Sequence, residues 1–179
     1  MAKGHLKGPR GELEVAKIVQ EWWRNYEPEA IFVRTPGSGG WHGRNQRGAA
    51  IRAGHNVSGD VTTSSTSFPF CVEVKRVEDF DMDNLVECSC VRPSPVWKWW
   101  LQVQREAGEV QKEPMLWFRQ NRKPWMVIVA LSYARENITV SPVVTWTTRQ
   151  LLNINCGASP VMYAAKDLLR MDPQLLARD

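Results

Sequence analysis

The chain has 179 residues, of which 43% are hydrophobic and 23% charged, a composition typical of a globular protein with one core. No apolar run approaches the roughly 18 residues of a membrane helix, and the start "MAKGHLKGPRGE" lacks the apolar centre of a signal peptide, so we expect a cytoplasmic protein without membrane contact. The formal charge of +4 is concentrated in the first third of the chain, which fits a polyanionic partner, although charge alone fits a solvated surface equally well.

The first predicted element is an amphipathic helix over Gly11–Arg24, where apolar residues recur at helical spacing. At about 100° per residue, Glu12 falls at the centre of the apolar stripe. An acid at this place either complements the positive end of the helix or begins its buried face as part of a site. The segment "AIFVR" at 30–34 then predicts a strand, which ends at "TPGSGG" because a proline and glycines stop it.

A long segment at 39–59 follows, rich in glycine, arginine and asparagine and without periodicity, which predicts a basic loop. Its arginines are Arg44, Arg47 and Arg52. They either form a solvated surface or grip a phosphate backbone. The segments "DVTT" and "FPFCVEVK" then predict two strands of a hairpin, joined by a turn rich in serine and threonine. This hairpin would place Asp60 opposite Glu73.

The second half of the chain predicts further helices and strands. An acidic loop with prolines leads to a second amphipathic helix over 96–107, and "PMLWFRQ" and "PWMVIVAL" predict a hairpin of buried strands. The segment "ITVSPVVTW" predicts an edge strand interrupted by Pro142, and "VMYAAKDLLRMDPQLLARD" one or two terminal helices. This order indicates an α/β (α+β) domain with a central mixed sheet flanked by helices, in which ligands bind at strand ends.

Glu73 and Lys75 share one face of their predicted strand, roughly 7 Å apart, because side chains alternate along a strand. Alone, such a pair is a salt bridge of little energetic weight. Together with Asp60 and Glu12, however, the set contains the residue types that metal-dependent phosphodiester hydrolysis requires. Carboxylates hold Mg²⁺ through oxygen, and a lysine orients or activates a water and stabilises charge on the phosphate.

The pair "GD" at Gly59–Asp60 and "EVK" at 73–75 resembles the PD-(D/E)XK nuclease motif, with a glycine where proline is often found. The wider order is similar to that of the archaeal-type Holliday junction resolvases: "KGPRGELEVAKIV" with Glu12, then "VRTPGSGG", then GD and EVK. This resemblance implies one nuclease domain over 1–179, made of a restriction-endonuclease-like core at about 7–131, an inserted basic loop at 39–59 and a C-terminal extension at 132–179.

The resemblance also implies roles for individual residues. Asp60, Glu73 and the Val74 carbonyl would bind the metal, Mg²⁺ or Mn²⁺ in its place, with Glu12 as a further carboxylate beside it. Lys75 would position or activate the water. It also implies contacts near the scissile phosphate from Arg34 and Ser38. Apart from the resemblance, contacts to DNA are expected from Lys7 and from Arg44, Arg47 and Arg52 of the basic loop.

Resolvases of that type are homodimers that nick opposing strands of a four-way junction, so we expect a homodimeric endonuclease acting on branched DNA. A PD-(D/E)XK nuclease that cuts duplex DNA in restriction or repair, and a non-catalytic DNA-binding module, are the alternatives. Leu13 stands where the archaeal members often have arginine, which indicates a divergent branch; a bacteriophage source would place the protein in the host cytoplasm. Gln102 and Gln104 of the second helix either approach the site or face solvent.

Overall fold

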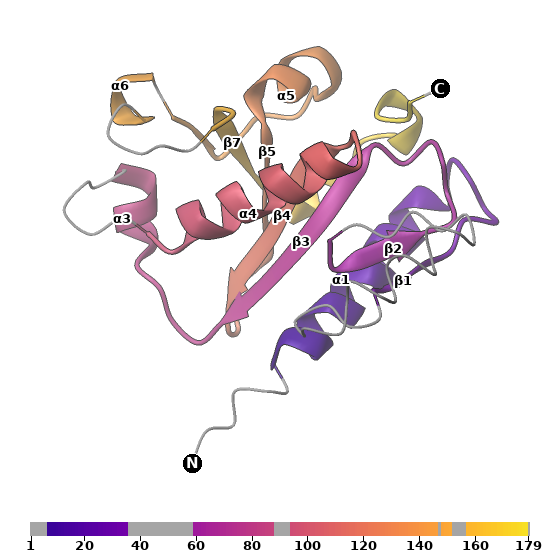
Figure 1. Ribbon diagram of the computed structural model, residues 1–179, viewed down its shortest axis with the longest axis horizontal. Coiled ribbons are helices and arrows are strands. Elements are labelled where there is room, and N and C mark those ends of the chain that lie inside the picture. Colours follow the sequence, from indigo (N-terminus) through magenta and orange to yellow (C-terminus); the bar gives the residue numbers. More distant parts are fainter. Residues whose placement is uncertain (1–6, 36–58, 88–93, 147, 152–156, 179) are drawn as a thin grey trace.

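The computed structural model describes residues 7–35, 59–87, 94–146, 148–151 and 157–178. They form a mixed five-stranded sheet flanked by helices and a separate two-stranded sheet (Figure 1). The expected α/β (α+β) class with a central mixed sheet is therefore confirmed. The elements of the described residues are α1 (Lys7–Trp23), β1 (Phe32–Arg34), β2 (Val61–Thr63), β3 (Phe70–Val77), α3 (Met82–Glu87), α4 (Val96–Glu109), β4 (Glu113–Gln120), β5 (Met126–Ala130), α5 (Leu131–Asn137), β6 (Val144–Thr145), α6 (Thr148–Leu151), β7 (Pro160–Ala164), α7 (Ala165–Leu168) and the 3-10 helix η2 (Pro173–Leu175).

The predicted first helix is confirmed, and α1 extends it at its N-terminal end. Its apolar stripe is buried against β1 and β3. Trp23 anchors the far end of the helix, with its ring edge-to-face against Phe68 at a centroid separation of 4.9 Å. Glu12 lies on the same buried face and is only 6% exposed, as the helical spacing predicts.

β2 pairs with β1 in antiparallel orientation, so the predicted hairpin between "DVTT" and "FPFCVEVK" is wrong. Alternation identifies a strand but not its partner. The serine-rich segment carries the chain from the small sheet to the large one, and the buried Ser65 hydroxyl accepts a hydrogen bond from Phe68 N–H at 3.2 Å. A parallel bridge between Gly59 and Val72 connects the segment just before β2 to β3.

The large sheet has the strand order β3-β4-β5-β7-β6. β3 and β4 are parallel and are linked through α4, whereas the remaining neighbours are antiparallel. The predicted second helix and the predicted β4–β5 hairpin are both confirmed. α4 packs on β3 and β4, while α1, β1 and β2 lie beside β3 (Figure 1). The acidic segment expected to be a loop contains the short helix α3.

The C-terminal segment departs most from its prediction. Residues 160–164 form β7, which lies between β5 and β6, so the expectation of helices alone is wrong there. A short apolar run such as "VMYA" cannot be assigned to strand or helix by periodicity. The edge strand β6 after Pro142 agrees with the prediction. None of the helices in the described parts of the chain has the length and apolar character needed to span a membrane.

Candidate active site

The residues expected to carry the chemistry surround one pocket of about 250 Å³. Four of the residues that line it are Glu12 of α1, Asp60 just before β2, and Glu73 and Lys75 of β3. Residues far apart in the sequence therefore meet where α1 and the start of β2 approach β3.

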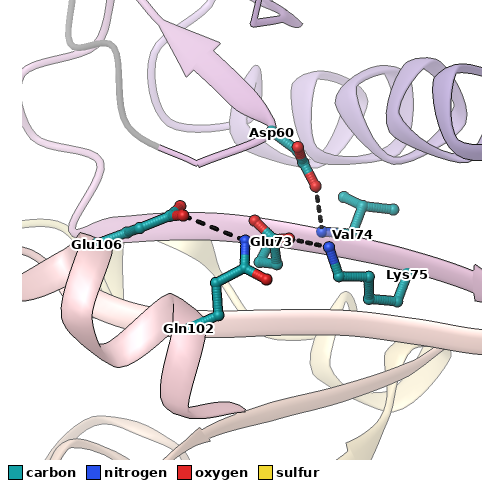
Figure 2. Close-up of polar contacts among 6 residues, drawn as sticks. All are labelled: Asp60, Glu73, Val74, Lys75, Gln102 and Glu106. Carbon is teal, nitrogen blue, oxygen red and sulfur yellow. Dashed lines mark hydrogen bonds and ion pairs between the residues drawn. The ribbon is translucent and has the colours of Figure 1, made fainter. Parts of the chain in front are cut away.

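Backbone contacts with β3 hold Asp60 in place. Its N–H donates to the Val72 carbonyl oxygen at 2.7 Å. Its Oδ2 accepts from the Val74 N–H at 2.9 Å (Figure 2). The preceding Gly59 has a φ of +67°, which a residue with a side chain rarely adopts. Asp60 thus lies beside Glu73 even though β2 and β3 are not a hairpin.

Glu73 and Lys75 form an ion pair on one face of β3, as the alternation predicts. Glu73 is 2% exposed, so this pair is buried on the carboxylate side. Gln102 of α4 also reaches Glu73, its Nε2 donating to Oε1 at 2.9 Å (Figure 2). Gln104 turns away, because its Oε1 accepts from the Ala158 N–H at 2.8 Å.

Glu106 is a pocket residue that the sequence analysis missed. Its Oε1 accepts a hydrogen bond from Gln102 Nε2 at 3.2 Å (Figure 2). The i,i+4 spacing of these two residues on a predicted helix is the one signal that places them side by side. That spacing alone does not indicate which face of the helix meets β3.

Arg34 of β1 and Glu12 form an ion pair next to the pocket. Glu12 is buried, and the guanidinium is partly exposed, so the pair joins the pocket to the surface beside β1. Lys7 is the first residue of α1. The other residues expected to contact DNA lie outside the described residues: Ser38, Arg44, Arg47 and Arg52.

The pocket concentrates carboxyl groups in a buried place. Burial raises the pKa of Asp60 to about 8, and the charges of Glu73 and Glu12 add to this rise, while the Val74 N–H opposes it. Burial also raises the pKa of Glu73, although the Lys75 ammonium counteracts it. For Lys75, burial favours the neutral amine, but the Glu73 carboxylate outweighs it, so the pKa of Lys75 is raised. A further cation would relieve the remaining repulsion between the carboxylates.

The donor set suits a hard divalent cation that keeps part of its water shell. Among the described residues, no three His, Cys, Asp or Glu side chains gather closely enough to hold an ion by themselves. Mg²⁺ usually binds through one or two carboxylates and several waters, and Asp60 and Glu73 could supply that number. The pocket therefore fits a partly hydrated cation better than one enclosed by protein ligands.

Comparisons with known proteins agree with this chemistry. The model of a family described as "Phage putative PDDEXK endonuclease" matches residues 3–166, a range that includes β7. Protein D14 of Escherichia phage T5 is 30% identical over 125 residues, which cover 68% of this chain and 67% of that protein. No solved structure matches the chain significantly.

Proposed function

The chain belongs to this phage PDDEXK endonuclease family, and we propose that it is a metal-dependent endodeoxyribonuclease that resolves four-way DNA junctions by paired symmetric nicks. Family membership supports the nuclease class, and junction specificity is the proposed step. The observation that carries the proposal is the meeting of Glu12, Asp60 and the Glu73–Lys75 pair around one pocket. Nucleases of the PD-(D/E)XK superfamily generally use divalent metals such as Mg²⁺.

In the proposed mechanism, Asp60, Glu73 and the Val74 carbonyl would hold the metal. When bound, the metal would supply charge neutralisation at the phosphate and lower the pKa of a water molecule. Lys75 lines the pocket and pairs with Glu73 on one face of β3. We assign it the role of positioning or activating the water and stabilising negative charge on the phosphate.

Glu12 of α1 and Arg34 of β1 are the remaining residues of the proposed site. The guanidinium of Arg34 fixes the Glu12 carboxylate through their ion pair and adds positive charge beside the pocket. A phosphate that enters next to Arg34 would meet a planar group with several donors, which suits phosphate geometry. Glu12 would act as a further carboxylate near the metal.

The junction specificity rests on sequence order. The blocks "KGPRGELEVAKIV", "VRTPGSGG", GD and EVK follow one another as in the resolvases. In the described residues, the first block lies in α1, Val33 and Arg34 lie in β1, and GD and EVK line the pocket. Two opposing nicks require two active sites, so the proposal includes a homodimer. Light scattering coupled to size exclusion tests this, and a monomer with and without junction DNA would contradict it.

The activity test compares an end-labelled four-way junction, a matched linear duplex and single-stranded DNA, with Mg²⁺, Mn²⁺ or EDTA. Paired symmetric nicks in the junction alone, abolished by EDTA and by Glu73→Gln, are expected. Glu136→Gln, an exposed glutamate of α5, is the matched control and should cut normally. Equal cutting of the duplex would indicate a PD-(D/E)XK nuclease of other specificity, and binding without cutting under any divalent metal would indicate a non-catalytic module.

A further inference from the structure

We propose that Gln102 and Glu106 of α4 are a positioning pair that orients the Glu73 carboxylate for metal binding. The inference rests on the proposed metal-dependent function and assigns a role to α4, which the nuclease motif does not include. The two residues line the same pocket as Asp60 and Lys75. They reach it from a helix that packs on β3 and β4, so they connect the pocket to the second layer of the fold.

The geometry centres on the amide nitrogen of Gln102. Nε2 donates to Glu73 Oε1 at 2.9 Å and to Glu106 Oε1 at 3.2 Å (Figure 2). An amide NH₂ group has two hydrogens, so both are used. Lys75 Nζ contacts the same Oε1 of Glu73. Two donors therefore converge on one oxygen of Glu73, which leaves Oε2 as the oxygen for a cation.

Glu106 determines which end of the amide faces Glu73. A side-chain amide has a donor end and an acceptor end, and either end can turn toward a neighbour. An ionised carboxylate only accepts hydrogen bonds, so two carboxylates on one side of Gln102 both require the nitrogen. Glu106 thereby keeps the donor end on Glu73, and the neutral amide separates the two acidic groups without adding charge.

Partners behind a metal ligand commonly matter to metal affinity as well as to activity. Losing such a hydrogen bond typically costs about 10- to 100-fold in metal affinity or activity, because the ligand loses its fixed orientation. Here the bond is charge-assisted and its acceptor is nearly fully buried, which places it among the stronger hydrogen bonds.

The test measures Mn²⁺ binding by calorimetry together with the metal concentration that gives half-maximal cleavage. Gln102→Leu should weaken Mn²⁺ binding by about 10- to 100-fold and raise the half-maximal metal concentration accordingly. Gln104→Leu is the matched control, since it makes the same change on the same helix at a residue bonded to Ala158, and it should leave both values unchanged. Urea unfolding of each variant verifies that the fold is retained.

Glu106→Gln gives a second variant, which retains the size of the side chain and an acceptor oxygen. It no longer requires one orientation of Gln102, so Mn²⁺ binding should weaken, but less than in Gln102→Leu. Wild-type affinity in both variants, or no Mn²⁺ binding by the wild type, would overturn the inference. Weakened Mn²⁺ binding without any DNA cleavage by the wild type would instead reject the proposed function and leave the positioning pair in place.

Discussion

Replacing Gly59 by proline, the residue often found at this place in the PD-(D/E)XK motif, should damage this protein. Gly59 has a φ of +67°, whereas the proline ring fixes φ near −65°, so the native backbone is inaccessible to proline. A Cβ atom at this position would also overlap the Val72 carbonyl oxygen and lie 2.9 Å from the carbonyl carbon. Both obstacles involve backbone, which cannot move aside without breaking the bridge to β3.

The magnitude follows from the hydrogen bonds that depend on this bridge. If the backbone at Gly59 moves, the Asp60 N–H loses Val72 and the Asp60 carboxylate loses the Val74 N–H. An unsatisfied buried backbone group costs about 1–3 kcal/mol, and a typical hydrogen bond contributes about 0.5–1.5 kcal/mol. We therefore expect a loss of about 1.5–4.5 kcal/mol, a large part of the roughly 5–15 kcal/mol that typically stabilises a domain.

Urea unfolding of Gly59→Pro and Gly59→Ala measures this loss, and Mn²⁺ calorimetry reports whether Asp60 remains in place. Alanine should also destabilise, because it keeps the overlap with Val72 and adds the left-handed penalty of about 1–2 kcal/mol. Gly108→Ala in α4 is the control, since nothing lies within 4 Å of the added Cβ. It should leave stability unchanged or raise it by up to about 1 kcal/mol. Wild-type stability and Mn²⁺ affinity in Gly59→Pro would refute the geometry assigned to Asp60.

Three other substitutions test contacts made by α1 and its neighbours. Arg34→Ala removes the ion pair to the buried Glu12 and should lower the free energy of unfolding by about 1–3 kcal/mol in urea; no change would show that the pair is not formed in solution. The hydrogen bond from the Ser65 hydroxyl lowers the pKa of Glu27 from its usual value of 4.5. The wild type should therefore be more stable than Ser65→Ala by its full margin above pH 4.5, and this margin should shrink as the pH falls below that value. Thermal unfolding at acid and neutral pH measures the difference. A pH-independent difference would contradict this origin. Leu13 is 50% exposed, so Leu13→Arg should change the free energy of unfolding by less than about 0.5 kcal/mol. If this face of α1 contacts DNA, a plot of log K for duplex binding against log[salt] should become steeper by about 0.9, where K is the association constant. An unchanged slope would show that this face does not contact DNA.

Local patterns in the sequence predict the elements that build the pocket. The apolar stripe of α1 is long enough to be assigned to a helix, and its phase places Glu12 on the buried face. Strand alternation likewise places Glu73 and Lys75 on one side of β3. These predictions succeed because a helix and a strand each have a fixed period, so a residue's face follows from its number.

The periodicity of a helix or strand does not show which other element it pairs with or packs against. The sequence pattern predicts a pairing of β2 with β3, but β2 pairs with β1, whose Phe32 forms an aromatic cluster with Trp23 and Phe68. β7 was missed because a short apolar run is compatible with either element, and only its place between β5 and β6 makes it a strand. Glu106 was missed because i,i+4 spacing identifies neighbours on a helix but not what the helix packs against.

The expectation that Asp60 lies beside Glu73 agrees with the structure although the hairpin that motivated it is wrong. Asp60 is held by backbone hydrogen bonds to Val72 and Val74, the two residues that flank Glu73 on β3. Both bonds are made by Asp60 itself, before β2 begins, so they do not depend on where β2 goes next. A short motif can therefore predict that two carboxylates meet, because it encodes the contact itself, while the route of the chain between them is decided by packing against α1 and β1.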